Sequence, residues 1–544
     1  MEVFNNYTRS IIVLLLFCML YGVIVVNLYF IQIKQSDFFK NLGNKQYNVT
    51  IQSYPQRGEI FDRNNKPIAI NNDSISAFIL PKTISNKEEL TTFLEKQFPQ
   101  AVARLDAYEH KNFMFIKRNL SEEEITAITT NNHPDIHLLK ESSRFYPYES
   151  LGPILGITDI DNNGLFGIEK QYNTQLQGIP TTYNLKKDAK LKHFYFSKET
   201  TQQGIEAEPI TLTIDADLQF KFQDILDQTL ANCDAKEAAA VALDPDTGEI
   251  LAMVSAPNFD PNNTKDLQIE TTKNRPISEC FETGSVIKVF AALAALEENI
   301  TTIDEIIDCE NTKETKIDNI RIRTVVPHGK ISFKDIIKYS NNIGIVKITK
   351  RLGTNLYDYY KALGLGELTG VNLQGEQKGF VNHPTNWSAY SIQSLTYGYE
   401  LTTNLLQLAR AFAVIVNDGY VITPQIIQQK NIKKVGPIVS SQTIQNMQDI
   451  LEETIQSGTG RRAKIAGYKI IGKTGTSNLL DNGLYNDDKH LYTFVGAIEH
   501  NNYKRVIVAY VKESKKVTYA SLVAAPLFKK LAETILLHDQ IFIT

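Results

Sequence analysis

The stretch at residues 282–296 constrains this chain more than any other. It reads Glu-Thr-Gly-Ser-Val-Ile-Lys and then Val-Phe-Ala-Ala-Leu-Ala-Ala-Leu. A helix of this composition is apolar on almost every face, which is typical of a buried core rather than a surface. Ser285 and Lys288 are three residues apart and would lie on one face at its start, where Gly284 can break the backbone.

This spacing can create an activated nucleophile. A lysine removed from water favours its neutral form and can then accept a proton. A serine beside such a base can attack a carbonyl group, and the N–H groups at a helix N-terminus can stabilise the resulting oxyanion. The same residues also fit a structural role, in which Ser285 caps a core helix and the Lys288 amine reaches solvent. The run alone does not separate the two interpretations.

Composition narrows the classes of function. The chain has 544 residues, a formal net charge of −4 and no basic block, which argues against nucleic acid as a partner. The cysteines at positions 18, 233, 280 and 309 lack the spacing of metal ligands, and no His-Glu-x-x-His motif is present. We therefore expect neither a disulfide framework nor a metal site.

A membrane anchor is predicted near the N-terminus. Residues 11–33 carry no charge and are long enough to span a bilayer, and no small-x-small cleavage site follows them. Arg9 precedes the span, while Lys34, Lys40 and Lys45 follow it, so charge alone does not orient the chain. We predict a cytoplasmic tail at 1–10 and an uncleaved anchor at 11–33.

Two further domains are expected, a small irregular mixed domain at 34–205 and a larger one at 206–544. In the first, a turn at Asn64-Asn65 interrupts a strand, and a capping box at 121–124 opens a helix. Arg57, Asp62 and Arg63 fit either an ion-paired corner or a solvated hairpin tip. The role of this domain is predicted to be structural.

The larger domain has an α+β pattern. A strand at 211–215 precedes an amphipathic helix at 216–232, and apolar runs at 238–243 and 249–255 flank a turn, as in a hairpin. Three more strands are expected far downstream, at 468–471, 492–498 and 505–511, with helices between the two sets. A sheet assembled from both ends of a domain and covered by helices is an α+β architecture.

Two further polar motifs lie downstream of the apolar helix. Ser340-Asn341-Asn342 follows a helical stretch; its hydroxyl can pass a proton and the Asn342 amide can hold a substrate amide, although such a run is more often a turn. Lys473-Thr474-Gly475-Thr476 ends a strand, where glycine lets another backbone approach and the other side chains suit a carboxylate. A β-bulge with polar surface residues is the alternative.

In this order, Ser285-x-x-Lys288, Ser340-x-Asn342 and Lys473-Thr474-Gly475 match the motif set of penicillin-binding proteins and class A β-lactamases. The chain resembles the class B penicillin-binding proteins, the monofunctional peptidoglycan D,D-transpeptidases. The resemblance covers nearly the whole chain, including the anchor and the runs at 57–64, 144–147, 164–178, 274–276, 366–376, 458–468 and 523–526.

The resemblance implies a serine β-lactamase-like transpeptidase domain, an irregular N-terminal pedestal domain of the penicillin-binding protein dimerisation type and one transmembrane helix. It implies that Ser285 attacks the penultimate D-Ala of a stem peptide, that Lys288 takes the proton, and that Ser340 and Lys473 relay the proton or stabilise charge. The N–H groups of Ser285 and Thr476 would form the oxyanion hole, and Thr474 and Thr476 would hold the terminal carboxylate. No metal or organic cofactor is implied.

Details within the motifs resemble the division-specific branch of the family, since Ser340-Asn341-Asn342-Ile343-Gly344 is of the division type. The sequence departs from the family pattern at Thr283, where proline is usual, and at Glu400, where glycine is usual. It also departs at Asn404-Leu405, in place of Thr-Pro, and at Ala520-Ser521, in place of two glycines. These departures leave loop geometry and β-lactam affinity open.

The implied partners are peptidoglycan stem peptides, a lipid-linked precursor, a polytopic glycan polymerase and other division proteins, with β-lactams as covalent inhibitors. The implied location is the cytoplasmic (inner) membrane, with a single pass and the bulk of the chain outside. Four alternatives remain open: an elongation-type transpeptidase, a β-lactamase, a β-lactam sensor and a non-catalytic division scaffold. Residues 34–205 argue against a hydrolase, which has no need of them.

Overall fold

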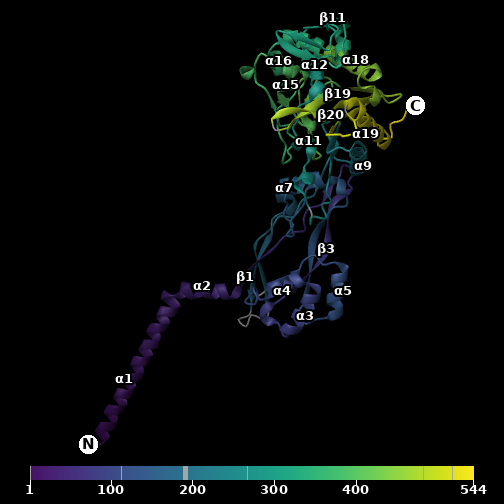
Figure 1. The fold of residues 1–544 in the computed structure, drawn as a ribbon. Helices are drawn as coiled ribbons and strands as arrows, with labels where there is room; N and C mark the ends of the chain where they lie inside the picture. The colour runs from purple at the N-terminus through teal and green to yellow at the C-terminus, as the bar shows by residue number, and fades with distance from the viewer. Residues whose placement is uncertain are drawn as a thin grey trace. The chain divides into compact units, whose positions relative to one another are not determined.

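The computed structural model describes residues 2–111, 113–187, 194–265, 267–481, 483–517 and 519–543 (Figure 1). The chain forms two compact units, one of residues 1–57 with 177–208 and the other of residues 58–176 with 209–544. The predicted domain boundary at 205/206 stays a prediction.

The first unit holds the predicted anchor. Helix α1 (Glu2–Tyr29) continues into a π-helical turn, η1 (Phe30–Lys34), and is followed by α2 (Ser36–Tyr47). The segment Asn6–Lys34 is long and apolar enough to cross a membrane, and its described side chains are exposed. Strands β1 (Asn48–Ser53), β6 (Thr181–Lys187) and β7 (Phe194–Gln202) form an antiparallel sheet. The N-terminal helix therefore fits a single-pass membrane anchor.

The second unit begins with a small mixed layer. Strands β2 (Ile60–Phe61), β3 (Pro67–Ile79), β4 (Met114–Lys117), β5 (His137–Phe145) and β8 (Ile210–Thr211) pair into one sheet. Helices α3 (Lys87–Gln97), α4 (Pro99–Leu105) and α5 (Glu122–Asn131) enclose a small apolar core with it. The capping box predicted at the start of α5 is confirmed: Ser121 and Glu124 each cap the other's backbone N–H.

The predicted turn after β2 is confirmed, because Asn65 has a φ of +62° and β3 begins two residues later. Around this turn, Asp62 accepts hydrogen bonds from the backbone N–H groups of Asn64, Lys66 and Ala216. Arg63 forms an ion pair with Glu249 at 3.1 Å. Asp62 and Arg63 therefore link this corner to the start of the larger α+β region.

The larger region is built on an antiparallel sheet in the order β10-β9-β21-β20-β19. Its strands are β9 (Glu237–Leu243), β10 (Ile250–Ala256), β19 (Lys469–Asp481), β20 (Leu484–His500) and β21 (Tyr503–Lys512). This is the sheet expected from both ends of the domain, and the α+β fold class is confirmed. Strand β19 lies at one edge, so part of its backbone is free to contact something other than a strand.

The two faces of this sheet belong to different apolar cores. Alternate residues of β9, namely Ala238, Ala240 and Ala242, pack with α9 (Ala216–Cys233) and α19 (Ala524–His538). The residues between them pack with α12 (Lys288–Glu297) and α17 (Leu405–Ala413) on the opposite side. This two-residue period is the geometry of a strand buried on both faces, and it places the apolar helix of the first motif inside the molecule.

Further elements surround these two cores. They are η3 (Glu149–Leu151), α7 (Gly167–Gln171), α10 (Ile269–Thr272), α11 (Arg275–Ser278), η4 (Gly284–Ile287), β13 (Ile320–Arg323), α13 (Phe333–Lys338), α14 (Asn342–Leu352), α16 (Ser391–Tyr397), α18 (Ser441–Ser457) and η7 (Ala520–Leu522).

We expect Leu531→Ala in α19 to destabilise this domain by about 2–5 kcal/mol, because it removes a fully buried side chain and leaves a cavity against the sheet. Leu537→Ala in the same helix is the matched control. Its side chain is 67% exposed, so the change should stay within about 0.5 kcal/mol. Denaturant unfolding of the full-length variants in detergent measures both, and equal losses would contradict the assigned packing of α19.

Candidate active site

The first motif folds as a tight turn that feeds the buried helix. Gly284 to Ile287 form the 3₁₀ turn η4, and α12 begins at Lys288, which confirms a helix start beside Ser285. Gly284 has a φ of +53°, a conformation that favours glycine. The Lys288 side chain is fully buried, whereas Ser285 is partly exposed. The snorkelling alternative for Lys288 is therefore wrong.

The second motif is a junction between two helices. Helix α13 ends at Lys338, and Ser340 adopts a φ of +59°, which is strained for a residue with a side chain. Asn341, fully buried, then caps α14 by accepting a hydrogen bond from the Gly344 N–H at 2.9 Å. The run is thus a turn, as its composition suggests, and this turn presents Ser340 and Asn342 to the same neighbour.

That neighbour is the amine of Lys288. Its Nζ lies 2.8 Å from the backbone oxygen of Ser340 and 3.1 Å from the Ser340 hydroxyl, and it also donates to the Asn342 side-chain oxygen. The other end of the Asn342 amide donates to the carbonyl of Arg323, at the end of β13, at 2.6 Å. Both ends of this amide are therefore engaged within the protein, one of them with the Lys288 amine.

The third motif lies on the edge strand β19, against the turn η4. A Cβ added to Gly475 would lie 2.6 Å from the Thr283 carbonyl oxygen, and one added to Gly284 would lie 2.3 Å from the Thr476 carbonyl oxygen. The two backbones therefore touch at positions where only glycine fits. Thr474 is buried and donates to the Thr459 hydroxyl at 3.3 Å, while Thr476 is partly exposed.

Burial changes the acid–base properties of both lysines. It lowers the pKa of Lys473, which is fully buried, to about 7. The pKa of Lys288 is also lowered well below its ordinary value, first by burial and then by the positive charge of Lys473. Both lysines therefore lose their protons more readily than an exposed lysine does, and they lie near a partly exposed serine, as general-base chemistry requires.

All the residues predicted from the three motifs meet in this region: Ser285, Lys288, Ser340, Asn342, Lys473, Thr474, Gly475 and Thr476. The contacts of Thr283 with Gly475 and of Gly284 with Thr476 join stretches separated by nearly two hundred residues of sequence. The convergence of three distant motifs on one site is the arrangement on which the enzymatic interpretation depends.

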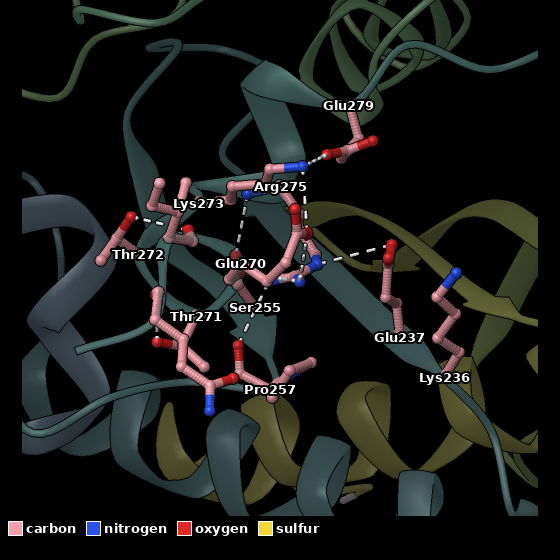
Figure 2. A network of polar contacts seen from close by, with 12 residues as sticks. Lys236, Glu237, Ser255, Pro257, Glu270, Thr271, Thr272, Lys273, Arg275 and Glu279 are labelled. Atoms are coloured by element: carbon pink, nitrogen blue, oxygen red, sulfur yellow. Dashed lines mark hydrogen bonds and ion pairs between the residues drawn. The ribbon is translucent and has the colours of Figure 1, made fainter. Parts of the chain in front are cut away.

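An ionic network around the buried Arg275 holds the segment that leads into the turn η4, called here the nucleophile turn because it carries Ser285 (Figure 2). The guanidinium of Arg275 lies 3.5 Å from Glu237 of β9, and it donates to the carbonyl oxygens of Pro257 and Glu270. Its backbone N–H donates to the Ser255 hydroxyl at 3.0 Å. Lys273 adds ion pairs with Glu270 and Glu279. The sequence indicates Arg275 only through the family resemblance, because its partner Glu237 on β9 is far away along the chain and no local pattern predicts their contact.

Three of the departures from the family pattern, at Thr283, Glu400 and Asn404, are accommodated by local geometry. Thr283 has a φ of −79°, which is close to the angle that proline imposes. Asn404 caps α17 and also donates to two carbonyl groups. Glu400 has a φ of +56° and accepts hydrogen bonds from Asn382 and Ser391. Ser521 lies partly exposed in η7, and nothing in the structure explains its replacement of glycine.

One carboxyl group near the nucleophile was not anticipated. Glu282 accepts a hydrogen bond from the Tyr485 hydroxyl at 3.0 Å, and burial raises the pKa of this carboxyl group. Tyr485 stacks edge-on against Tyr399, which follows Gly398. A Cβ on Gly398 would lie 2.2 Å from the Gly284 carbonyl oxygen, so this aromatic rim is packed directly against the nucleophile turn.

Comparison with known proteins agrees with this geometry. Residues 238–533, more than half of the chain, match the family described as Penicillin binding protein transpeptidase domain, and residues 52–212 match the Penicillin-binding Protein dimerisation domain. Peptidoglycan D,D-transpeptidase FtsI of Buchnera aphidicola is 30% identical over 557 residues, covering 98% of this chain and 96% of that protein. Stage V sporulation protein D of Bacillus subtilis is 29% identical, covering 94% and 84%.

Among solved structures, penicillin-binding protein 3 of Mycobacterium tuberculosis aligns with a TM-score of 0.71 and 25% identity, covering 91% of this chain and 98% of that one. The family matches, the relatives and the shared fold extend over both the small mixed layer and the larger α+β region. The chain therefore belongs to the class B penicillin-binding proteins, the family of serine-type peptidoglycan D,D-transpeptidases.

Proposed function

We propose that this protein cross-links peptidoglycan stem peptides through an acyl-enzyme on Ser285. The observation that carries this proposal is the amine of Lys288, buried in an apolar helix one turn from Ser285 and held by Ser340 and Asn342. In its neutral form, this amine can donate to the Ser340 carbonyl and the Asn342 side-chain oxygen. Its lone pair is then left for a proton from a hydroxyl group.

In the acylation step, the Ser285 oxygen forms a bond to the carbonyl carbon of the penultimate D-Ala while its proton passes to Lys288. The negative charge moves to the carbonyl oxygen, where the N–H groups of Ser285 and Thr476 stabilise it. Collapse of this intermediate breaks the peptide bond, and the departing amine of D-Ala takes a proton from the lysine pair. An amine of a neighbouring stem then attacks the ester carbonyl carbon, the bond to the Ser285 oxygen breaks, and a proton lost by the attacking amine passes through the lysine pair to the Ser285 oxygen.

The third motif holds the donor's carboxylate. Thr474 and Thr476 supply hydroxyl groups, and Lys473 supplies charge when it is protonated. With a pKa of about 7, Lys473 is poised between its two forms, and a carboxylate bound nearby favours the charged form. Substrate binding would thereby assign the positive charge to Lys473 and leave Lys288 neutral as the base.

We expect Ser285→Ala to abolish covalent labelling by a fluorescent penicillin, because a β-lactam that mimics the donor is trapped on this hydroxyl. Ser441→Ala is the control, since Ser441 is exposed at the start of α18 and has no place in the site. Gel fluorescence of the purified full-length proteins measures both. Labelling that persists in Ser285→Ala would exclude Ser285 as the nucleophile.

The acylation rate should depend on pH in a defined direction. A lysine with a lowered pKa is inactive as a base when protonated, so the rate should fall as the pH drops through the pKa of the pair, near 7 for Lys473. Second-order rate constants between about pH 5.5 and 9.5 test this. Lys288→Arg should be inactive across the range, because a guanidinium stays protonated. A flat profile for the wild type would contradict a lysine base.

The cellular role we propose is septal wall synthesis during division. Two features support it, the division-type run Ser340-Asn341-Asn342 and relatives that carry the name FtsI. The bulk of the chain would lie outside the cytoplasmic membrane, where peptidoglycan is assembled. A polytopic glycan polymerase would contact the anchor and residues 34–200.

A fluorescent fusion expressed at native level tests this role, with a band at midcell in dividing cells as the expected result. Depletion should produce filaments rather than rounded cells, because septal synthesis alone would be lost. A signal spread along the side wall, with rounding on depletion, would instead assign the protein to elongation.

A further inference from the structure

A large cavity lies beside α9, away from the predicted catalytic residues. Its volume is about 1000 Å³, and its walls are residues 147–150, one side of α9 with the residues just beyond it, and the loop at 257–260. None of the residues assigned to acylation lines it. Nothing in the proposed reaction requires this cavity.

The cavity wall is strongly acidic. The residues that line it in the described part of the chain include no lysine, arginine or histidine, but they include six acids: Glu149, Asp217, Asp224, Asp227, Asp234 and Asp260. The chain as a whole has 57 basic and 61 acidic residues, so this one-sided distribution is local and does not reflect the overall composition.

Most of this charge is not compensated within the protein. Asp217 forms an ion pair with Lys66 at 2.7 Å, and Asp234 forms one with Lys515 at 3.2 Å. The other four acids have no ion pair with any described residue. The side chains of three of them accept only amide hydrogen bonds: Asp224 from Gln228, Asp227 from Gln223, and Asp260 from Asn262.

An exposed aromatic ring lies within this acidic stripe. Asp217, Phe220, Asp224 and Asp227 are spaced by three or four residues and share one face of α9. The Phe220 side chain is 60% exposed between them. A phenyl face flanked by carboxylates is a favourable environment for a guanidinium group, which can stack on the ring and pair with the acids.

Buried acceptors in the wall also lack donors. The Ser150 hydroxyl is in a side chain only 5% exposed, and Gln223 is 6% exposed; neither the Ser150 Oγ nor the Gln223 Oε1 has a hydrogen-bond partner among the described residues. The side-chain oxygen of Asn258 is also buried and has no hydrogen-bond partner among the described residues. All three residues line the cavity. Unsatisfied buried acceptors are unfavourable, so the polar groups of this wall are not fully paired within the protein.

A metal ion is a poor candidate for this site. No group of three or more acidic, histidine or cysteine side chains in the described residues is close enough together to hold one. The carboxylates are instead spread along α9 and the facing loops, as an extended polycation would require. Desolvation and the neighbouring Asp224 also raise the pKa of Asp227, so its charged form would gain from a cationic neighbour.

We propose that this cavity binds an arginine-rich segment of a partner protein. The segment lies along α9, its guanidinium groups pair with the uncompensated carboxylates, and one of them stacks on Phe220. The partner is a protein rather than the wall polymer, since the acidic stripe repels the carboxylates of stem peptides.

Fluorescence anisotropy of the full-length protein in detergent tests the proposal. The probe is a fluorescein-labelled peptide of alternating arginine and alanine, compared with the same peptide carrying glutamine in place of arginine. The arginine peptide should bind the wild type and weaken with added salt, whereas the glutamine peptide should not bind. Equal binding of the two peptides would overturn the proposal.

Two variants localise the binding. Asp224→Asn/Asp227→Asn should weaken the affinity about tenfold, the size expected for two partly exposed ion pairs. Phe220→Ala, at an exposed position, should weaken it about threefold through loss of the ring.

The matched control is Asp449→Asn/Glu452→Gln on α18, which has the same charge change and the same three-residue spacing. Its affinity should equal that of the wild type. An equal loss in the control, or no loss in the α9 variants, would overturn the proposal. So would self-association of the wild type, seen by sedimentation without peptide and lost in Asp224→Asn/Asp227→Asn, because the occupant would then be a second copy of this chain.

Discussion

The rest of the site depends on a single amine that is kept out of water. Lys288 begins a helix in which all the following side chains through Leu296 are apolar and buried. A charge on its amine would therefore be solvated only by two oxygens of Ser340 and one of Asn342. Desolvation of this kind disfavours the charged amine and is the largest cause of the lowered pKa of Lys288. The apolar composition of α12, which looks like ordinary core packing, is thus the direct cause of the acid–base chemistry at its first residue.

The antiparallel sheet converts sequence-distant motifs into neighbours. Strand β19 is at the edge, so its outer backbone contacts the turn η4 instead of another strand. Toward the opposite edge of the sheet, Arg275 of the segment preceding Ser285 forms an ion pair with Glu237 of β9. Arg275 also donates a hydrogen bond to the carbonyl oxygen of Pro257. Pro257 begins the loop that lines the acidic cavity. The nucleophile turn is therefore held from two sides of one rigid layer.

Features that depend on local periodicity could be predicted from the sequence. They include the apolar helix, the hairpin around Gly248, the capping box at Ser121 and the three late strands. Features created by tertiary contacts could not. No local pattern predicts the φ of +59° at Ser340 or the ion pair of Arg275 with Glu237. Nor does any predict that the Asn342 amide contacts Lys288 with its oxygen and the Arg323 carbonyl with its nitrogen. The amphipathic character of α9 can be predicted from its sequence. The cavity beside it cannot, because its other walls come from two segments remote in sequence, residues 147–150 and 257–260.

The glycines at 284, 398 and 475 bring three stretches of main chain into direct contact, leaving no volume for even a methyl group between them. Such a joint restricts the routes by which the protein could evolve resistance to a suicide inhibitor. Mutations at the joint would separate the reacting groups and abolish turnover together with inhibition. Changes are better tolerated outside this contact, at positions such as Glu400, whose side chain accepts hydrogen bonds from Asn382 and Ser391.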